Sequence, residues 1–211
     1  MDETQFSLSF CPARPGDASL AAELIAMSDG ELGVALFGLG DPVLERHVLT
    51  GLYQQNGNRY SYEWGEIAEV SGQAAGLLLA VPGAAIPRLN LGMARQLWRL
   101  YGLRCWLEFC RRAVMLASFK EVEPGELMVG NLAVLTQFQG RGIARRLLAR
   151  AEELARRLGL ARLALTVDLG NPRARHIYIS AGYRVELTYP TGLRQPLLRT
   201  AGFERMVKEV E

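Results

Sequence analysis

The sequence predicts a mixed α/β fold in which helices cover both faces of a central, mostly antiparallel sheet. Three observations support this prediction. Residues 60–70 and 73–81 are two strand-like stretches joined at Ser71-Gly72, as in an antiparallel hairpin. Residues 126–135 and 160–167 flank a helical pattern, and such a strand–helix–strand crossover makes its two strands parallel. Further helical patterns supply the layers that a sheet must pack against.

The N-terminal elements follow from local spacing. Residues 6–10 alternate Phe or Leu with Ser, which predicts a strand with one buried face. Asp17 is a suitable cap for a helix that runs to about residue 27. Residues 30–40 are rich in glycine, which favours a loop with a short turn, and Pro42 is placed to begin a helix over residues 43–54.

The later elements are predicted in the same way. Residues 88–119 are helical in composition with a break at Gly102, and residues 142–158 form an amphipathic helix that ends at Gly159. A short helix over residues 172–181 precedes two strands, 183–187 and 203–208, which we expect to be antiparallel.

The segment 84–120 lies between the third and fourth predicted strands and is strongly basic. It holds seven Lys or Arg residues against the single acid Glu108, a net charge of 7 − 1 = +6. Three interpretations stay open: an extra helical layer, a wall over an acceptor pocket, or a contact with a membrane or nucleic acid. As a wall, its charge would favour an anionic acceptor.

Composition limits the class of protein. A chain of 211 residues suits one domain with a substantial core, and its net charge of +2 does not indicate nucleic-acid binding. Three cysteines without CxxC spacing and only two histidines argue against a disulfide framework and a metal centre. The first residues lack the pattern of a signal peptide, and no apolar stretch reaches membrane-spanning length, so we expect a cytoplasmic protein.

The residues most indicative of function form a glycine turn between a predicted strand and a predicted helix. The turn comprises Gln139, Gly140, Arg141, Gly142, Ile143, Ala144 and Arg145. The first N–H groups of a helix have no intrahelical partner, and the helix dipole adds positive charge there, so such a turn can bind phosphate. Its two arginines could add charged contacts. A simple tight turn is the alternative interpretation.

Spacing excludes two well-known glycine loops. A P-loop requires Lys and then Ser or Thr after its second glycine, where this chain has Ile143-Ala144. The dinucleotide-binding fingerprint requires Gly or Ala at the position of Arg145.

The pattern Gln139-x-x-Gly142-x-Ala144 instead resembles the acetyl-CoA loop of the GNAT superfamily of N-acetyltransferases. A second motif, Asn171-x-x-Ala174-x-x-x-Tyr178 followed by Gly182-Tyr183, is similar to another signature of that superfamily. The resemblance is close over about residues 123–186. It implies one acetyltransferase domain over residues 1–211, whose parallel strand pair splays apart, with 84–120 as a helical insertion.

The resemblance also implies roles for individual residues. The glycine turn, residues 139–145, would bind the pyrophosphate of acetyl-CoA. Leu132, Ala133 and Val134, on a bulged strand, would pair with its pantetheine arm, and the Leu132 amide would stabilise the oxyanion. Asn171 would bond the same arm, although a helix N-cap explains it equally well. Tyr178 would protonate the departing thiolate, with core packing as its alternative role.

The general base is the weakest part of the pattern. Family members that use a strand glutamate carry it four residues before the oxyanion-binding position, where this chain has Met128. Glu126 lies one strand repeat away on the same face and is a candidate catalytic residue. Glu66, Glu69, Asp168 and a chain of waters remain alternatives.

The sequence thus predicts an acetyl-CoA-dependent N-acetyltransferase without a metal. Acetyl-CoA would be the cosubstrate, and the acceptor would be a primary amine of a small molecule or peptide that attacks directly. We expect no nucleic-acid or membrane partner, and either a single chain or a homodimer. The alternative is a CoA-binding sensor or interaction module with little turnover, which Met128 favours and Tyr178 disfavours.

Overall fold

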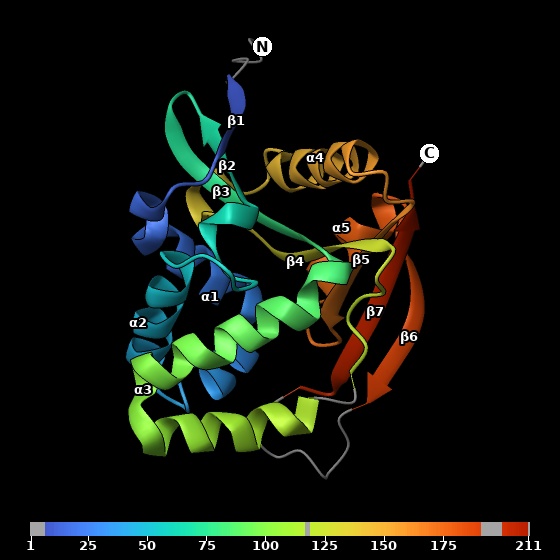
Figure 1. Cartoon of the computed structure of the whole chain (residues 1–211). Helices are drawn as coiled ribbons and strands as arrows, with labels where there is room; N and C mark the ends of the chain where they lie inside the picture. Colours follow the sequence, from blue (N-terminus) through green and yellow to red (C-terminus); the bar gives the residue numbers. More distant parts are fainter. Residues whose placement is uncertain (1–6, 117–118, 191–199, 211) are drawn as a thin grey trace.

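The computed structural model describes residues 7–116, 119–190 and 200–210. Phe6, at the predicted start of the first strand, lies outside the described residues. A single sheet of seven strands runs through the molecule in the order β1-β2-β3-β4-β5-β7-β6 (Figure 1). The strands are β1 (Leu8–Pro12), β2 (Gly65–Val70), β3 (Gln73–Pro82), β4 (Glu126–Val134), β5 (Arg162–Asp168), β6 (Arg184–Pro190) and β7 (Gly202–Glu209). Among the strands of the described residues, β4 and β5 form the one parallel pair, as predicted.

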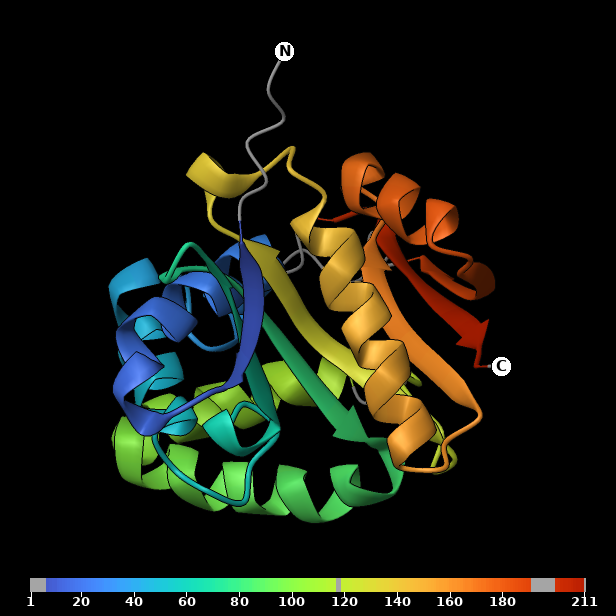
Figure 2. The same cartoon turned by 90° about the horizontal axis from the view of Figure 1, so that it is seen from above.

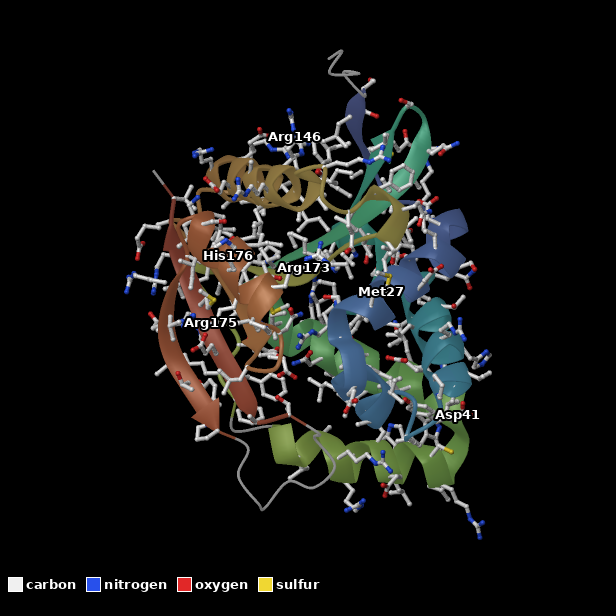
Figure 3. The ribbon with its side chains drawn as sticks, turned by 180° about the vertical axis from the view of Figure 1, so that it is seen from behind. Met27, Asp41, Arg146, Arg173, Arg175 and His176 are labelled. Atoms are coloured by element: carbon white, nitrogen blue, oxygen red, sulfur yellow. The ribbon has the colours of Figure 1, made fainter. Side chains whose placement is uncertain are left out.

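Helices cover both faces of this sheet, which confirms the predicted fold class (Figure 2). Three lie on one face: α1 (Ala18–Leu36), α2 (Pro42–Tyr53) and α3 (Ile86–Leu116). On the other face lie α4 (Ile143–Arg157) and α5 (Pro172–Ser180). A hydrophobic core lies on each face of the sheet, and the side chains of β3 alternate between the two. Leu77 and Leu79 pack with α1 and α2, while Leu78 packs with α4. Asp41 caps α2 by accepting a 2.8 Å hydrogen bond from Val43 N (Figure 3).

The predicted loop over residues 30–40 is wrong for most of its length. Helix α1 bends at Gly30, where φ is 56° and ψ is −138°, and then continues to Leu36. Gly33 allows close packing rather than a turn. A Cβ at this position would lie 2.2 Å from Glu45 Oε1 on α2. Glycine content therefore marks a close helix–helix approach here, which the sequence pattern does not distinguish from a loop.

The strand predicted from residue 60 begins only at Gly65. Local hydrogen bonds hold the chain differently before that point. Asn58 Oδ1 accepts from Tyr60 N at 2.7 Å, and Ser61 Oγ accepts from Glu63 N at 3.1 Å at the start of a short 3₁₀ helix, Tyr62–Trp64. Side chains of this kind compete with strand pairing, which accounts for the shorter strand.

The inserted segment forms α3, two helical stretches that meet at Gly102 (φ 69°), as predicted. It packs beneath the N-terminal helices. The Phe109 ring stacks on Phe37 with centroids 5.8 Å apart, and Arg112 Nη1 donates to Ala35 O at 2.6 Å. Helix α3 is thus a further layer over α1 and α2. No described helix is long and apolar enough to cross a bilayer.

Candidate active site

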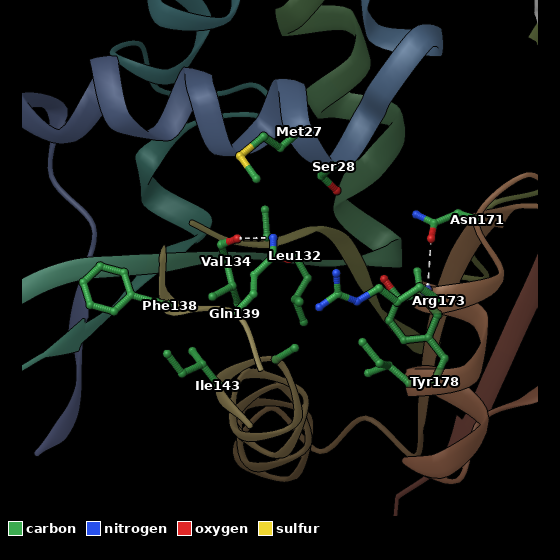
Figure 4. A pocket seen from close by; sticks show the side chains of 14 residues that line it. Met27, Ser28, Leu132, Val134, Phe138, Gln139, Ile143, Asn171, Arg173 and Tyr178 are labelled. Atoms are coloured by element: carbon green, nitrogen blue, oxygen red, sulfur yellow. Dashed lines mark hydrogen bonds between the residues drawn. The ribbon is translucent and has the colours of Figure 1, made fainter. Parts of the chain in front are cut away.

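A cavity of about 290 Å³ opens where β4 and β5 separate. The two strands pair only between residues 126–128 and 162–164. Beyond that point β4 contains an extra residue, Gly130, because Asn131 pairs with Leu79 while Val129 pairs with the next residue of β3. The cavity lining comes from four parts of the chain (Figure 4): Met27, Ser28, Leu132, Ala133, Val134, Phe138, Gln139, Ile143, Ala144, Asn171, Arg173, Ala174, Ile177 and Tyr178.

The glycine turn leads from β4 into α4 beside this cavity. Gly140 and Gly142 have φ values of 78° and 75°, a conformation that favours glycine. The first helical hydrogen bond recorded at this end runs from Arg146 N to Gly142 O at 3.2 Å. Among the described residues, no acceptor pairs with the backbone N–H groups of residues 140–145. A Cβ at either glycine would meet nothing within 4 Å, so there is open space beside the turn.

Gln139 has a structural role that its motif position does not reveal. Its side-chain Nε2 donates a 3.0 Å hydrogen bond to the carbonyl oxygen of Val134 (Figure 4). Thr136–Phe138 form a short 3₁₀ helix between these two residues. This hydrogen bond joins the residues on either side of the 3₁₀ helix. It therefore holds the start of the glycine turn against the end of β4.

The two arginines of the turn do not line the cavity. The Arg141 guanidinium lies 5.5 Å from the centroid of the Phe138 ring, a cation–π distance. Arg145 Nη2 donates to Ser180 Oγ on α5 at 3.3 Å. Both side chains therefore lie at the outer side of the turn, and Arg145 links α4 to α5.

Helix α5 forms the opposite wall of the cavity. Asn171 caps it, because its Oδ1 accepts from Ala174 N at 3.0 Å, and the same side chain lines the cavity. Burial raises the pKa of the Tyr178 hydroxyl above its ordinary value of 10. The Tyr178 ring also packs against Tyr183 with centroids 6.0 Å apart. The hydroxyl thus stays protonated at neutral pH.

Glu126 is not brought to the cavity. It is 1% exposed at the opposite end of β4, about 20 Å from Leu132 at the usual rise per strand residue. Its carboxylate pairs with Arg205 and with Arg162 Nη1, the latter at 3.1 Å. It also accepts from Glu123 N at 2.7 Å. These ion pairs and this hydrogen bond hold the carboxylate away from the cavity, so we leave Glu126 out of the proposed site.

The sequence interpretation missed several lining residues. Phe138, Arg173, Ala174 and Ile177 belong to the two motifs or adjoin them, and helical i,i+4 spacing from Tyr178 points to Ala174. Met27 and Ser28 carry no such signal, because α1 is far away in the sequence. Figure 3 places Met27 on α1 and Arg173 on α5, on opposite sides of the cavity. Within the described residues, no group of three His, Cys, Asp or Glu side chains could hold a metal ion.

Part of the chain is similar to a known protein family. Residues 88–183 match the model of the acetyltransferase (GNAT) family. A stretch of 77 residues is 36% identical to the chloroplastic GCN5-related N-acetyltransferase 4 of Arabidopsis thaliana, covering 36% of this chain and 26% of that protein. The chain therefore matches only about a quarter of that relative's length.

Solved structures share the fold over nearly the whole chain. A crystal structure described as an acetyltransferase is 22% identical, with a TM-score of 0.64, over 96% of this chain and all of that one. An N-acetyltransferase from Staphylococcus aureus Mu50 is 18% identical, with a TM-score of 0.68, over 94% of this chain and 99% of that one. The matched segment, the splayed strand pair and the glycine turn agree with one another: residues 88–183 of this chain are similar to the acetyltransferase (GNAT) family.

Proposed function

We propose that this chain binds acetyl-CoA in the cavity between β4 and β5 and transfers the acetyl group to a primary amine. The observation that carries the proposal is the turn at residues 140–145, whose backbone N–H groups lack partners among the described residues. These donors lie at the N-terminus of α4, where the helix dipole also favours an anion. Ile143 and Ala144, at the start of this helix, line the cavity.

The other cavity residues suit the remainder of acetyl-CoA. The edge of β4 that faces β5 is unpaired beyond residue 128, so the backbone groups of Leu132 and the N–H of Val134 are available to a pantetheine arm. The Val134 carbonyl instead accepts from Gln139, and Ala133 lies between Leu132 and Val134 with its backbone toward β3. Asn171 uses its Oδ1 as a cap and keeps its amide N–H groups for a ligand. Arg173 adds a cation on the same wall. We assign the phosphate contacts to the backbone of the turn, with Arg141 and Arg145 as outer charges.

The chemistry assigned to the chain is proton transfer and orientation. Tyr178 holds a proton in the cavity and would deliver it to the departing thiolate. An N–H group at Leu132 would donate to the carbonyl oxygen of the thioester as negative charge develops there. The amine attacks directly in this scheme, since no Cys or Ser with a paired base lines the described cavity.

We place the protein in the cytoplasm, since all three cysteines are free in the structure. The acceptor is a small-molecule or peptide amine, and the chain acts alone or as a homodimer. The second candidate is a CoA-binding sensor with little turnover, which Met128 on β4 favours because it removes a carboxylate from the strand.

Two measurements test this proposal together. Calorimetry measures the binding of acetyl-CoA, and a thiol assay measures CoA release with methylamine, spermidine, lysine and a peptide with an N-terminal alanine. A transferase binds acetyl-CoA and releases CoA in response to an amine. Binding without amine-dependent release identifies the sensor, and a chain that does not bind acetyl-CoA contradicts both candidates.

A further inference from the structure

A carboxylate from α1 reaches the face of β4 next to the cavity. The Asn131 side-chain amide donates to Asp29 Oδ1 at 2.6 Å. Asn131 is 5% exposed and immediately precedes Leu132, which lines the cavity. Asp29 is half-buried and immediately follows Met27 and Ser28, which line the cavity as well. Two chain segments 102 residues apart thus meet through this hydrogen bond, each one residue away from a residue that lines the cavity.

The face of β4 that carries Asn131 is the one covered by α1 and α3. Met128 and Ala133 lie on the same face, as their packing with helix residues shows. Strand alternation puts the side chain of Leu132 on the opposite face.

The charges around Asp29 come from three further elements. Arg59 and Glu121, paired at 2.6 Å, lie near enough to influence it, and so do Glu45 on α2 and the Tyr60 hydroxyl. Burial raises the pKa of the Asp29 carboxyl to about 7, opposed by the Asn131 hydrogen bond and by Arg59. One cation, Arg59, thus lies among three carboxyl groups, those of Asp29, Glu45 and Glu121. A carboxyl group with such a pKa can both accept and release a proton near neutral pH.

We propose that Asp29 is the proton acceptor for the acceptor amine and that Asn131 positions it. The inference rests on the proposed function. An ammonium group binds to the Asp29 carboxylate, its N–H bond breaks, and an O–H bond forms on Asp29. The nitrogen keeps the electron pair and becomes a neutral nucleophile, and Asp29 afterwards returns the proton to solvent. The amine thus approaches from the α1 side, while acetyl-CoA lies along the α4–α5 side.

The first test needs no acceptor. NMR titration of ¹³C-labelled aspartate side chains, assigned by Asp29→Asn, measures the pKa of this carboxyl in the whole chain. We expect a value near 7, well above the ordinary aspartate value of about 3.9. Asn131→Ala removes the hydrogen bond that favours the charged form, so it should raise this pKa further. A wild-type value near 4 overturns the proposal.

The second test uses two acceptors of similar size but different charge. Methylamine is an ammonium ion at neutral pH, whereas hydroxylamine is largely uncharged. Asp29→Asn should lower kcat/KM for methylamine by about 10²-fold or more, and for hydroxylamine by less than tenfold. The matched control is Glu31→Gln, an exposed acid on the same helix, which should change neither rate.

The outcomes separate this inference from the function on which it rests. Equal losses with both amines give Asp29 a purely structural role, and unchanged rates show that another group takes the proton. Either result overturns the inference while leaving the transferase intact. A wild-type chain that binds acetyl-CoA but releases no CoA with either amine also counts against it. If Asp29→Asn does not fold, Asn131→Ala must shift the acidic limb of the methylamine pH profile to higher pH.

Discussion

Two carboxylates, one near each end of β4, lie in opposite surroundings. Where β4 pairs with β5, Glu126 is 1% exposed and is matched by two guanidinium groups, Arg205 and Arg162. Where the strands have separated, Asp29 accepts a hydrogen bond from the amide of Asn131 on β4, and no described residue forms an ion pair with it. A carboxylate paired with two guanidinium groups supports structure, whereas one without a direct cationic partner is available for proton transfer. Environment, rather than position in a motif, therefore separates the two roles.

The largest effect on stability that we expect is at the end of β4 that pairs with β5. Arg205 is fully buried and pairs with both Glu126 and Glu186. Arg205→Met leaves these carboxylates without that partner and should lower the free energy of unfolding by about 3–5 kcal/mol. Urea denaturation measures the change. The control is Arg184→Met, whose exposed pair with Glu209 at 3.1 Å should contribute about 0–1 kcal/mol. Similar losses of unfolding free energy in both variants would contradict the view that the buried ion pairs stabilise the fold more than the exposed one.

At the cavity, where β4 and β5 have separated, Tyr178→Phe removes one hydroxyl and little volume. If Tyr178 delivers the proton to the leaving thiolate, kcat should fall about 10²-fold while acetyl-CoA affinity stays nearly unchanged. Steady-state kinetics and calorimetry measure both quantities. Tyr183→Phe is the matched control, because the Tyr183 ring packs against Tyr178 but does not line the cavity. Equal turnover by Tyr178→Phe and wild type would leave Tyr178 a packing residue.

The smallest effect concerns the pH dependence of stability near Asp29. Burial, then the charge of Asp29, raises the pKa of Glu45 from 4.5 to about 7. The folded state therefore binds more protons than the unfolded state between these values, and its stability falls as pH rises through this window. Glu45→Gln should flatten this fall, whereas exposed Glu31→Gln should not. Urea titrations from pH 4 to 8 measure the slope, and parallel curves for wild type and Glu45→Gln would contradict the assignment.

The donor side of the site could be predicted from sequence because its residues are contiguous. The glycine turn and the Asn171–Tyr178 helix are single segments, and local spacing placed most of their residues at the cavity. The strand–helix–strand crossover also predicted the parallel pair correctly.

The acceptor side could not be predicted in this way. Asp29 and Asn131 meet only through tertiary packing, and the glycines from Gly30 onward concealed the second half of α1. Choosing Glu126 followed from strand alternation, which gives the face of a side chain but not its ion-pair partners. The +6 charge of residues 84–120 suggested an anionic acceptor, yet α3 contributes no residue to the described cavity lining.

The most direct measurement compares two glycines at the ends of α4. Gly142 and Gly159 have φ values of 75° and 67°, and a Cβ on either meets nothing within 4 Å, so substitution strains both alike. Glutamate at Gly142 places a carboxylate beside the unpaired N–H groups, whereas at Gly159 it lies at the far end of the helix. Calorimetry should show acetyl-CoA binding weakened about 10²-fold or more, about 2.7 kcal/mol, in Gly142→Glu. Gly159→Glu should bind like wild type. Equal affinities in the two folded variants would contradict phosphate binding by this turn.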